Sequence, residues 1–206
     1  MGTAHSAFFR LVVALSALAW CFSAAALCFA EQPTEQIRTA MERVSEVLQD
    51  VSAKRGANKD EAIEKIRRIL LPSFDFTEMA RRSMGSHWQD LNGRQSEFVA
   101  AFAGFVEGSY LSTLESYRGE KIVYMRERVE QELAEVDTQI LHGAGEALSV
   151  NYRLHLVEGQ WKVYDVVVDD ISLTTNFRSQ FNRVLATASM DELMKKLRAK
   201  APGAPA

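Results

Sequence analysis

The amino-acid sequence predicts an α+β domain in which helices wrap one face of a four-stranded antiparallel sheet. Up to Tyr117, apolar residues recur every three or four positions, as they do in amphipathic helices. From Ile122 to Val168 the apolar residues alternate instead, in four runs joined by short links, which is typical of an antiparallel meander. Grouping of helices and strands in separate stretches favours α+β over a parallel α/β fold.

Residues 1–30 are expected to be a signal peptide that is removed. Arg10 is the only charged residue in this segment, and a run of small and apolar residues follows it. Cleavage after Ala30 is preferred over cleavage after Ala26, because polar chain begins at Glu31. The alternative is an uncleaved membrane anchor, since about 20 apolar residues can span a bilayer.

The remaining chain suits one domain, expected over residues 31–200, with a disordered tail at 201–206. Cys21 and Cys28 both lie in the signal-like segment, so the mature chain has neither disulfides nor thiolate chemistry. Without Arg10 the chain has 23 basic and 27 acidic residues, a net charge of −4, and no basic block. This balance disfavours binding to nucleic acid or to an anionic membrane surface through bulk charge.

Four helices are predicted before the strands. The first covers about 34–54, the second ends before Pro72, and a short third covers about 76–84. The fourth, Arg94–Tyr117, carries a broad aromatic stripe that consists of Phe98, Phe102, Phe105, Val106, Tyr110, Leu114 and Tyr117. Gly104 and Gly108 lie on another face of this helix, and each costs about 1 kcal/mol relative to Ala. Two such costs indicate a need for room, either for close helix packing, which is the plainer interpretation, or for a bound group.

The predicted strands cover about 122–130, 133–142, 148–156 and 161–168. The third strand alternates most clearly, and a hairpin turn at Glu158–Gln160 leads into the fourth. Ser172 is then expected to cap a helix that carries Phe177 and Phe181 on one face. A capping box that begins at Ser189 opens a last helix.

Candidate catalytic and metal-binding residues are few. None of the four histidines has a partner at metal-ligand spacing, and the chain has no nucleophile elbow, phosphate loop or dinucleotide fingerprint. Asp165 is the candidate general base of an enzyme, because strand alternation places it on an apolar face with Trp161, Val163 and Val167. The alternative is a structural ion pair between Asp165 and either Arg153 or Arg183.

The stretch WKVYDVVVDDISLTTNFRSQFNRVL, residues 161–185, resembles the signature of the periplasmic phospholipid-binding proteins of the Mla (maintenance of lipid asymmetry) pathway, the toluene-tolerance or MlaC family. The matching residues are Trp161, Tyr164, Asp165, Ile171, Ser172, Asn176, Arg178, Ser179, Gln180 and Phe181. The segment LLPSFDF at 70–76 and the order of elements fit the same family. The chain departs from it at Asp170, where the family usually has Gly. If this position needs a left-handed backbone, Asp tolerates it less well than Gly but better than most residues.

The resemblance implies a highly twisted sheet, similar to a nuclear-transport-factor-2-like cone, with an apolar cavity for the acyl chains of a phospholipid. A diacyl lipid has about 30 methylenes, so a surface groove that leaves half of them wet would forfeit roughly 12 kcal/mol, which favours an interior cavity. The residues expected to contact lipid are Phe98, Phe102, Phe105, Val106, Tyr110, Leu114, Val150, Tyr152, Leu154, Val166, Val168, Leu173, Phe177 and Phe181.

The resemblance further implies a monomeric, non-catalytic carrier in the periplasm that needs no cofactor and no metal. Its expected partners are phospholipid, an outer-membrane lipoprotein–porin complex, and the MCE-domain subunit of an inner-membrane ABC transporter. Such transport serves outer-membrane lipid asymmetry and toluene tolerance. Two other classes stay open: a small periplasmic isomerase or hydrolase that uses Asp165 with Tyr164 or Tyr152, and a partner-binding module without a ligand.

Overall fold

The computed structural model describes residues 31–53, 59–116, 120–142 and 146–201, and the description below concerns these residues. The predicted signal peptide and most of the predicted tail lie outside this part of the chain. The elements are α2 (Pro33–Ala53), α3 (Lys59–Leu70), the 3₁₀ turn η1 (Leu71–Ser73), α4 (Phe76–Met84), the 3₁₀ helix η2 (Gly85–Leu91), α5 (Gln95–Ser116), β1 (Lys121–Glu130), β2 (Leu133–His142), β3 (Glu146–Val157), β4 (Gln160–Val168), β5 (Ile171–Ser172), α6 (Leu173–Leu185) and α7 (Met190–Arg198).

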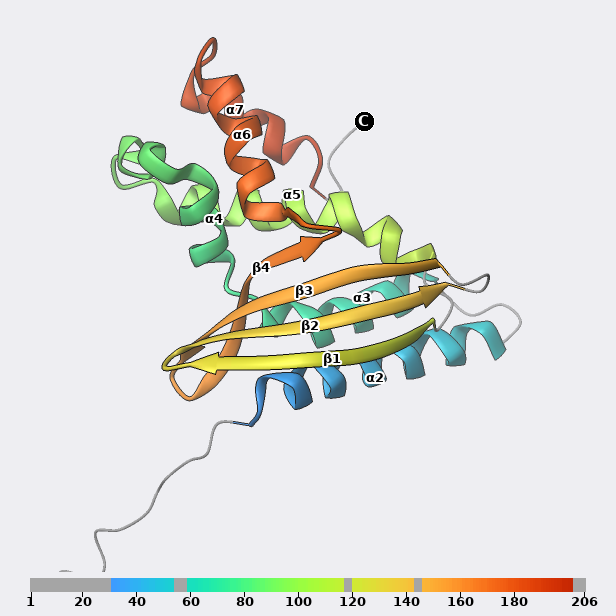
Figure 1. Cartoon of the computed structure of the whole chain (residues 1–206). Coiled ribbons are helices and arrows are strands. Elements are labelled where there is room, and N and C mark those ends of the chain that lie inside the picture. The colour runs from blue at the N-terminus through green and yellow to red at the C-terminus, as the bar shows by residue number, and fades with distance from the viewer. Residues whose placement is uncertain (1–30, 54–58, 117–119, 143–145, 202–206) are drawn as a thin grey trace, which may run out of the picture. The chain divides into compact units, whose positions relative to one another are not determined.

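The strands form one antiparallel sheet in the order β1-β2-β3-β4-β5 (Figure 1). The predicted α+β class and the four-stranded meander are confirmed, and the two-residue β5 is an addition. It forms because Val168 pairs with Ile171 across a two-residue turn. Asp169 and Asp170 make this turn with φ of 44° and 65°, so the family's Gly position does need a left-handed backbone, which Asp tolerates better than most residues.

A β-bulge in β4 decides which of its side chains share a face of the sheet. Val163 and Asp165 pair with consecutive residues of β3, so Tyr164 is the extra residue. One extra residue reverses the alternation of faces. Val163 and Val166 therefore lie on the same face, and Asp165 lies on the opposite one. The prediction that Asp165 shares a face with Trp161 and Val163 is wrong for this reason.

Helices α2 and α3 run along one face of β1–β3 (Figure 1). The side chain of Gln36 in α2 hydrogen-bonds both main-chain groups of Trp161: its Nε2 donates to the carbonyl oxygen at 2.5 Å, and its Oε1 accepts from the amide at 3.2 Å. At the start of α2, the Thr34 amide donates to Glu127 Oε2 of β1 at 2.8 Å. These contacts attach α2 to both β1 and β4.

The free edge of β4 is covered by the chain that enters α4. The Asp75 amide donates to the Val163 carbonyl oxygen at 2.9 Å, and Phe74 forms a parallel bridge with Val163. Asp75 is also the N-cap of α4, because its Oδ1 accepts from the Glu78 amide at 2.9 Å. Asp75 thus donates a hydrogen bond to the edge of β4 and also caps the N-terminus of α4.

Helices α4, α5, α6 and α7 lie together (Figure 1), and their buried side chains form a packed core that also includes Leu91 of η2 and Tyr164 of β4. Its centre is aromatic, because Phe98 and Phe102 of α5 are fully buried against α6. The Phe102 ring lies edge-on to Phe177 at 5.5 Å and to Phe181 at 6.1 Å between ring centroids. Such edge-to-face pairs add about 0.5–1.5 kcal/mol each to the free energy of unfolding beyond area burial.

Gly104 of α5 gives this helical core a close contact. A Cβ atom at this position would lie 3.0 Å from the Cβ of Ala201, which follows α7. The expectation that the glycines of this helix provide room for close packing is confirmed at Gly104. The predicted caps are confirmed as well: Ser172 Oγ accepts from the Thr175 amide at 3.1 Å, and Ser189 Oγ from the Glu192 amide at 3.3 Å.

Candidate functional site

An apolar cavity of about 410 Å³ lies between the sheet and helices α2, α3 and α5. The sheet contributes Ile140, Leu148, Val150, Tyr152, Leu154, Val163, Val166 and Val168. The helices and their connections contribute Gln36, Ile37, Ala40, Met41, Ile66, Arg67, Leu70, Leu71, Ser73, Phe74, Phe76, Met79, Val106, Glu107 and Leu173. A mainly apolar concavity with few polar groups is the usual form of a small-molecule site.

The sheet side of the cavity depends on register. Leu154 pairs with Val163 and Tyr152 pairs with Val166, so these four side chains occupy one face of adjacent strands. Without the extra residue at Tyr164, Val163 and Val166 would point to opposite faces. The bulge therefore keeps an unbroken apolar surface along β4.

The helix side comes from the apolar stripes of α2 and α3. Ile37 and Met41 line the cavity from α2, and Ile66 and Leu70 line it from α3. Each pair is spaced four residues apart, which places both members on one face of their helix. The opposite faces of both helices are charged and exposed.

Two charged side chains stand on this apolar wall. Arg67 of α3 and Glu107 of α5 form an ion pair, and they are the only charged residues among the described residues that line the cavity. The Glu107 side chain is 8% exposed, whereas the Arg67 side chain is 34% exposed. The Arg67 side chain therefore lines the cavity and is also partly exposed to solvent.

Comparison with known proteins identifies the family. A family profile described as MlaC protein matches residues 38–199. The chain belongs to the MlaC family. A curated relative from Haemophilus influenzae, the intermembrane phospholipid transport system binding protein MlaC, is 25% identical over 142 residues. These residues are 66% of this chain and 66% of that relative, so the chain matches just under two thirds of the relative's length.

A solved structure has the same fold. The phospholipid-binding protein from Ralstonia solanacearum, solved in complex with a phospholipid, superimposes with a TM-score of 0.72. The match covers 82% of this chain and 97% of that chain at 20% sequence identity. The arrangement of helices around the antiparallel sheet is thus one that this chain shares with that solved protein.

Half of the residues predicted to contact lipid lie on the cavity. They come from β3, β4 and the helices next to them, and they are Val106, Val150, Tyr152, Leu154, Val166, Val168 and Leu173. The structure brings these residues together around one space. Their contact with lipid stays a prediction.

Five other predicted residues lie in or against the packed core of α4–α7, outside the cavity lining; they are Phe98, Phe102, Phe105, Phe177 and Phe181. Helical spacing shows that a face is buried but does not tell a packed core from the wall of a cavity. The side chains of Tyr110 and Leu114 lie outside the described part of the chain. Ile37 and Ile66 also line the cavity but are not among the predicted lipid contacts, because their helical spacing is that of any amphipathic helix.

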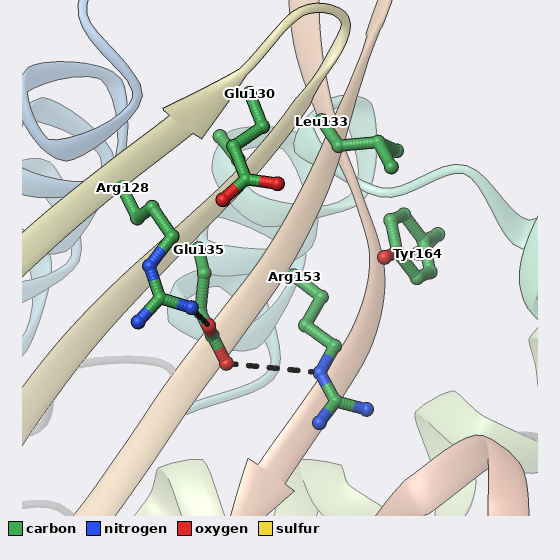
Figure 2. A pocket seen from close by; sticks show the side chains of 7 residues that line it. Arg128, Glu130, Leu133, Glu135, Arg153 and Tyr164 are labelled. Carbon is green, nitrogen blue, oxygen red and sulfur yellow. Dashed lines mark hydrogen bonds and ion pairs between the residues drawn. The ribbon is translucent and has the colours of Figure 1, made fainter.

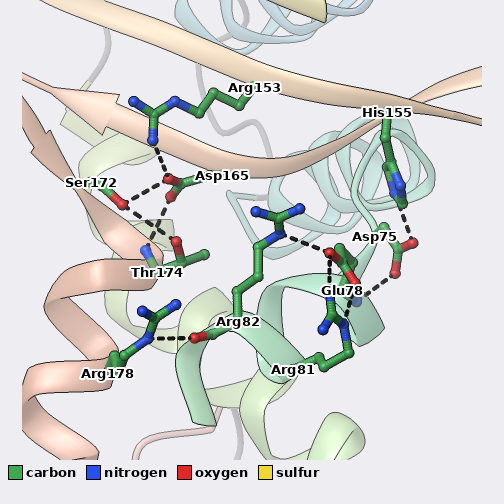
Figure 3. A network of polar contacts seen from close by, with 10 residues as sticks. All are labelled: Asp75, Glu78, Arg81, Arg82, Arg153, His155, Asp165, Ser172, Thr174 and Arg178. Atoms are coloured by element: carbon green, nitrogen blue, oxygen red, sulfur yellow. Dashed lines mark hydrogen bonds and ion pairs between the residues drawn. The ribbon is translucent and has the colours of Figure 1, made fainter. Parts of the chain in front are cut away.

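Asp165, the candidate catalytic base, is held in a structural network (Figure 3). It is 2% exposed, and its Oδ2 accepts from Arg153 Nη1 at 3.2 Å and from Ser172 Oγ at 2.7 Å. Its Oδ1 accepts from the Thr174 amide at 3.0 Å. The ion pair with Arg153 confirms one of the two alternatives for this residue. The network fixes β4 to the start of α6 on the face of the sheet away from the cavity.

The face of the sheet opposite the cavity carries ion pairs between neighbouring strands. Glu135 of β2 lies between Arg128 of β1 at 3.5 Å and Arg153 of β3 at 3.9 Å, beside a small hollow of about 150 Å³ (Figure 2). These ion pairs are part-exposed, so each contributes little stability. Leu133 of β2 also lines this hollow and is half exposed, so the outer face combines ion pairs with exposed apolar side chains.

A second polar group on this side attaches α4 to β3 (Figure 3). His155 Nε2 lies 3.0 Å from Asp75 Oδ2 at the N-terminus of α4. One turn later, burial alone would raise the pKa of Glu78, but hydrogen bonds from Arg81 and Arg82 leave that pKa below its ordinary value. Arg81 and Arg82 therefore serve as partners of the Glu78 carboxylate within the same helix.

Within the described residues, no group of three or more His, Cys, Asp or Glu side chains is arranged to hold a metal ion. In the same part of the chain, no helix combines the length and the apolarity needed to cross a bilayer.

Proposed function

We propose that the protein is a non-catalytic phospholipid carrier that holds acyl chains in the cavity between the sheet and helices α2, α3 and α5. The observation that carries this proposal is the apolar cavity of about 410 Å³ in a chain of the MlaC family. Two related proteins support it: one is named for binding in phospholipid transport, and the other was solved with a phospholipid.

Energetics support an occupant for this cavity. Acyl chains that enter this apolar space gain about 0.8 kcal/mol for each methylene they bury. Apolar side chains of the sheet and of α2, α3 and α5 line it, so the chains would leave water on all of these sides.

The proposed lipid contacts combine the sheet wall with the stripes of α2 and α3. Val150, Leu154 and Val166 would contact the chains from the sheet, and Ile37 and Ile66 from the helices. The phenylalanines of the α4–α7 core have a different part in the proposal: they hold α5 and α6 rigidly, and α5 carries Val106 on the cavity wall.

The setting of the carrier is proposed from the family and from the N-terminal sequence. Residues 1–30 export the chain to the periplasm and are then removed. There the protein works as a monomer and needs no cofactor. It moves phospholipid between an outer-membrane lipoprotein–porin complex and the MCE-domain subunit of an inner-membrane ABC transporter. The isomerase or hydrolase alternative has no comparable support, because both carboxylate oxygens of Asp165 have structural partners.

Lipid analysis of the purified protein tests the proposal. The full-length gene is expressed in a Gram-negative host, the product is purified from the periplasmic fraction, and bound lipid is extracted and identified by mass spectrometry. We expect phospholipid in stoichiometric amounts and a protein mass that begins near Glu31. A protein that carries no lipid, and takes up none from phosphatidylglycerol vesicles, would contradict the carrier function.

A further inference from the structure

The ion pair between Arg67 and Glu107 is out of place on a wall that only needs to accept hydrocarbon. Replacing a buried ion pair with apolar residues of similar volume is often neutral or stabilising, because desolvation offsets the attraction between the charges. The Glu107 carboxylate is almost fully buried beside the cavity, so its desolvation is large. The ion pair therefore contributes little to folding stability, and stability alone does not explain its place on the cavity wall.

Arg67 has the reach and the donors to bind a further anion. Its Nη1 lies 3.0 Å from Glu64 Oε2, and its Nε faces Glu107. A guanidinium has five N–H donors, so two carboxylates leave donors for a third acceptor. One third of the Arg67 side chain is exposed, and the residue also lines the cavity. It thus stands where a ligand would pass from the apolar space to water.

The charges around Arg67 balance. Glu64 is shared with Arg68, whose Nε lies 3.3 Å from Glu64 Oε1. Arg67 and Arg68 therefore face Glu64 and Glu107, and this group of four has no net charge. An incoming phosphate meets no excess of negative charge here. Arg binds phosphate in a fork geometry and is only weakly hydrated, so it suits such a part-buried position better than Lys would.

We propose that Arg67 binds the phosphate group of the lipid whose chains occupy the cavity, with Glu107 holding the guanidinium in place and competing with the phosphate for it. This inference rests on the proposed carrier function and goes beyond it, because it names the phosphodiester as the recognised polar group and one side chain as its partner. Competition by Glu107 keeps the binding weak enough for a carrier that must release its cargo.

A purely structural pair that joins α3 to α5 makes a different prediction. Loss of a structural contact weakens the cavity for every lipid with the same chains. Loss of a phosphate contact weakens only the lipid that has a phosphate. The quantity that separates the two is the ratio of phospholipid to diacylglycerol that the protein takes up, called the head-group ratio below.

The experiment offers the purified protein vesicles that contain equal amounts of phosphatidylglycerol and diacylglycerol with identical acyl chains. Bound lipids are quantified by mass spectrometry. The variants are Arg67→Met, Glu107→Gln, and the double variant, which leaves no unpaired buried carboxylate. Arg68→Met is the matched control, because Arg68 shares Glu64 but is 74% exposed and does not line the cavity.

We expect Arg67→Met and the double variant to lower the head-group ratio at least tenfold. Glu107→Gln should raise it several-fold, because the guanidinium then shares its charge with Glu64 alone and no longer with Glu107. Arg68→Met should leave it unchanged. Equal ratios in all variants would overturn the inference, while a wild-type protein that takes up neither lipid would instead overturn the carrier function itself.

Inorganic phosphate distinguishes a lipid phosphate from a free anion. The inference predicts that millimolar inorganic phosphate shifts the melting temperature of lipid-free wild type and of Arg67→Met equally, because without acyl chains the contact is too weak. A saturable shift that requires Arg67, together with an unchanged head-group ratio, would assign the residue to a free anion and overturn the lipid phosphate proposal.

Discussion

Val150→Trp is predicted to remove lipid without unfolding the protein. Val150 lies in β3, where it pairs with Val168, and both side chains line the cavity. The residue is 6% exposed, so exposure alone does not distinguish it from a residue of a packed core. The difference lies in the surroundings of its side chain. The added indole ring would extend into the cavity, whereas in a packed core it would collide with a neighbouring side chain.

The magnitude follows from the volume that the indole takes from the lipid. If the ring displaces about four methylenes at about 0.8 kcal/mol each, lipid binding weakens by about 3 kcal/mol, or roughly 100- to 200-fold. In a packed core the same enlargement would cost about 1–3 kcal/mol of folding stability. At a cavity wall that stability cost should be close to zero.

The assay compares lipid content with the melting temperature of delipidated protein. Phe102→Trp is the control, because Phe102 is fully buried among aromatic rings of the α4–α7 core. We expect Val150→Trp to lose lipid and keep its melting temperature. Phe102→Trp should melt lower, by about 2–4 °C for each kcal/mol lost. The reasoning is refuted if Val150→Trp unfolds as readily as Phe102→Trp, or if it stays folded and retains its lipid.

Three further predictions concern stability. Asp165→Asn removes a buried ion pair and should cost about 2 kcal/mol in urea unfolding; a chemical turnover that disappears at unchanged stability would favour an enzyme instead. Asp170→Gly removes the cost of a positive φ in a residue with a side chain, so it should raise the free energy of unfolding in urea by about 0.5–1 kcal/mol. A lower free energy of unfolding would contradict the left-handed backbone at this turn. Hydrogen bonds from Arg94 and Arg198 lower the pKa of Glu97 to about 2 from 4.5. A lowered pKa gives stability that is present above pH 4.5 and is lost as the pH falls toward 2. The melting temperature should therefore fall more over this pH range in wild type than in Glu97→Gln. An equal fall of the melting temperature in the two proteins would refute this prediction.

The elements of the fold were predictable because each follows from a local pattern. Helical spacing located α2 and α5, and alternation located β3 within two residues of its bounds. The bulge at Tyr164 was not predictable in this way, because a bulge inserts one residue without changing composition or hydrophobicity. Alternation counted through Tyr164 therefore assigned Asp165 to the wrong face.

The cavity was predictable in part for a similar reason. The alternation of β3 identified Val150 and Leu154, because only one face of that strand is apolar. The aromatic stripe of α5 was just as clear, yet Phe98 and Phe102 pack against α6 and lie outside the cavity lining. A stripe shows that a helix face is buried, whereas what it is buried against depends on tertiary packing.

The pairing of Arg67 with Glu107 has no sequence signal either. The two residues are forty positions apart and lie on different helices. Neither matches a motif, and each is an ordinary charged residue at a helical position. Their meeting on an apolar wall follows only from the tertiary structure, which brings the two side chains together.

Photo-crosslinking with a lipid that carries a diazirine at the end of one acyl chain tests the central claim most directly. The label is loaded into the purified protein from vesicles, activated by light, and mapped by peptide mass spectrometry. The account predicts adducts on cavity-lining residues of β3, β4, α2 and α3, with Leu154 and Ile66 among them. Adducts confined to the aromatic core of α4–α7, or a folded protein that takes up no labelled lipid, would contradict it.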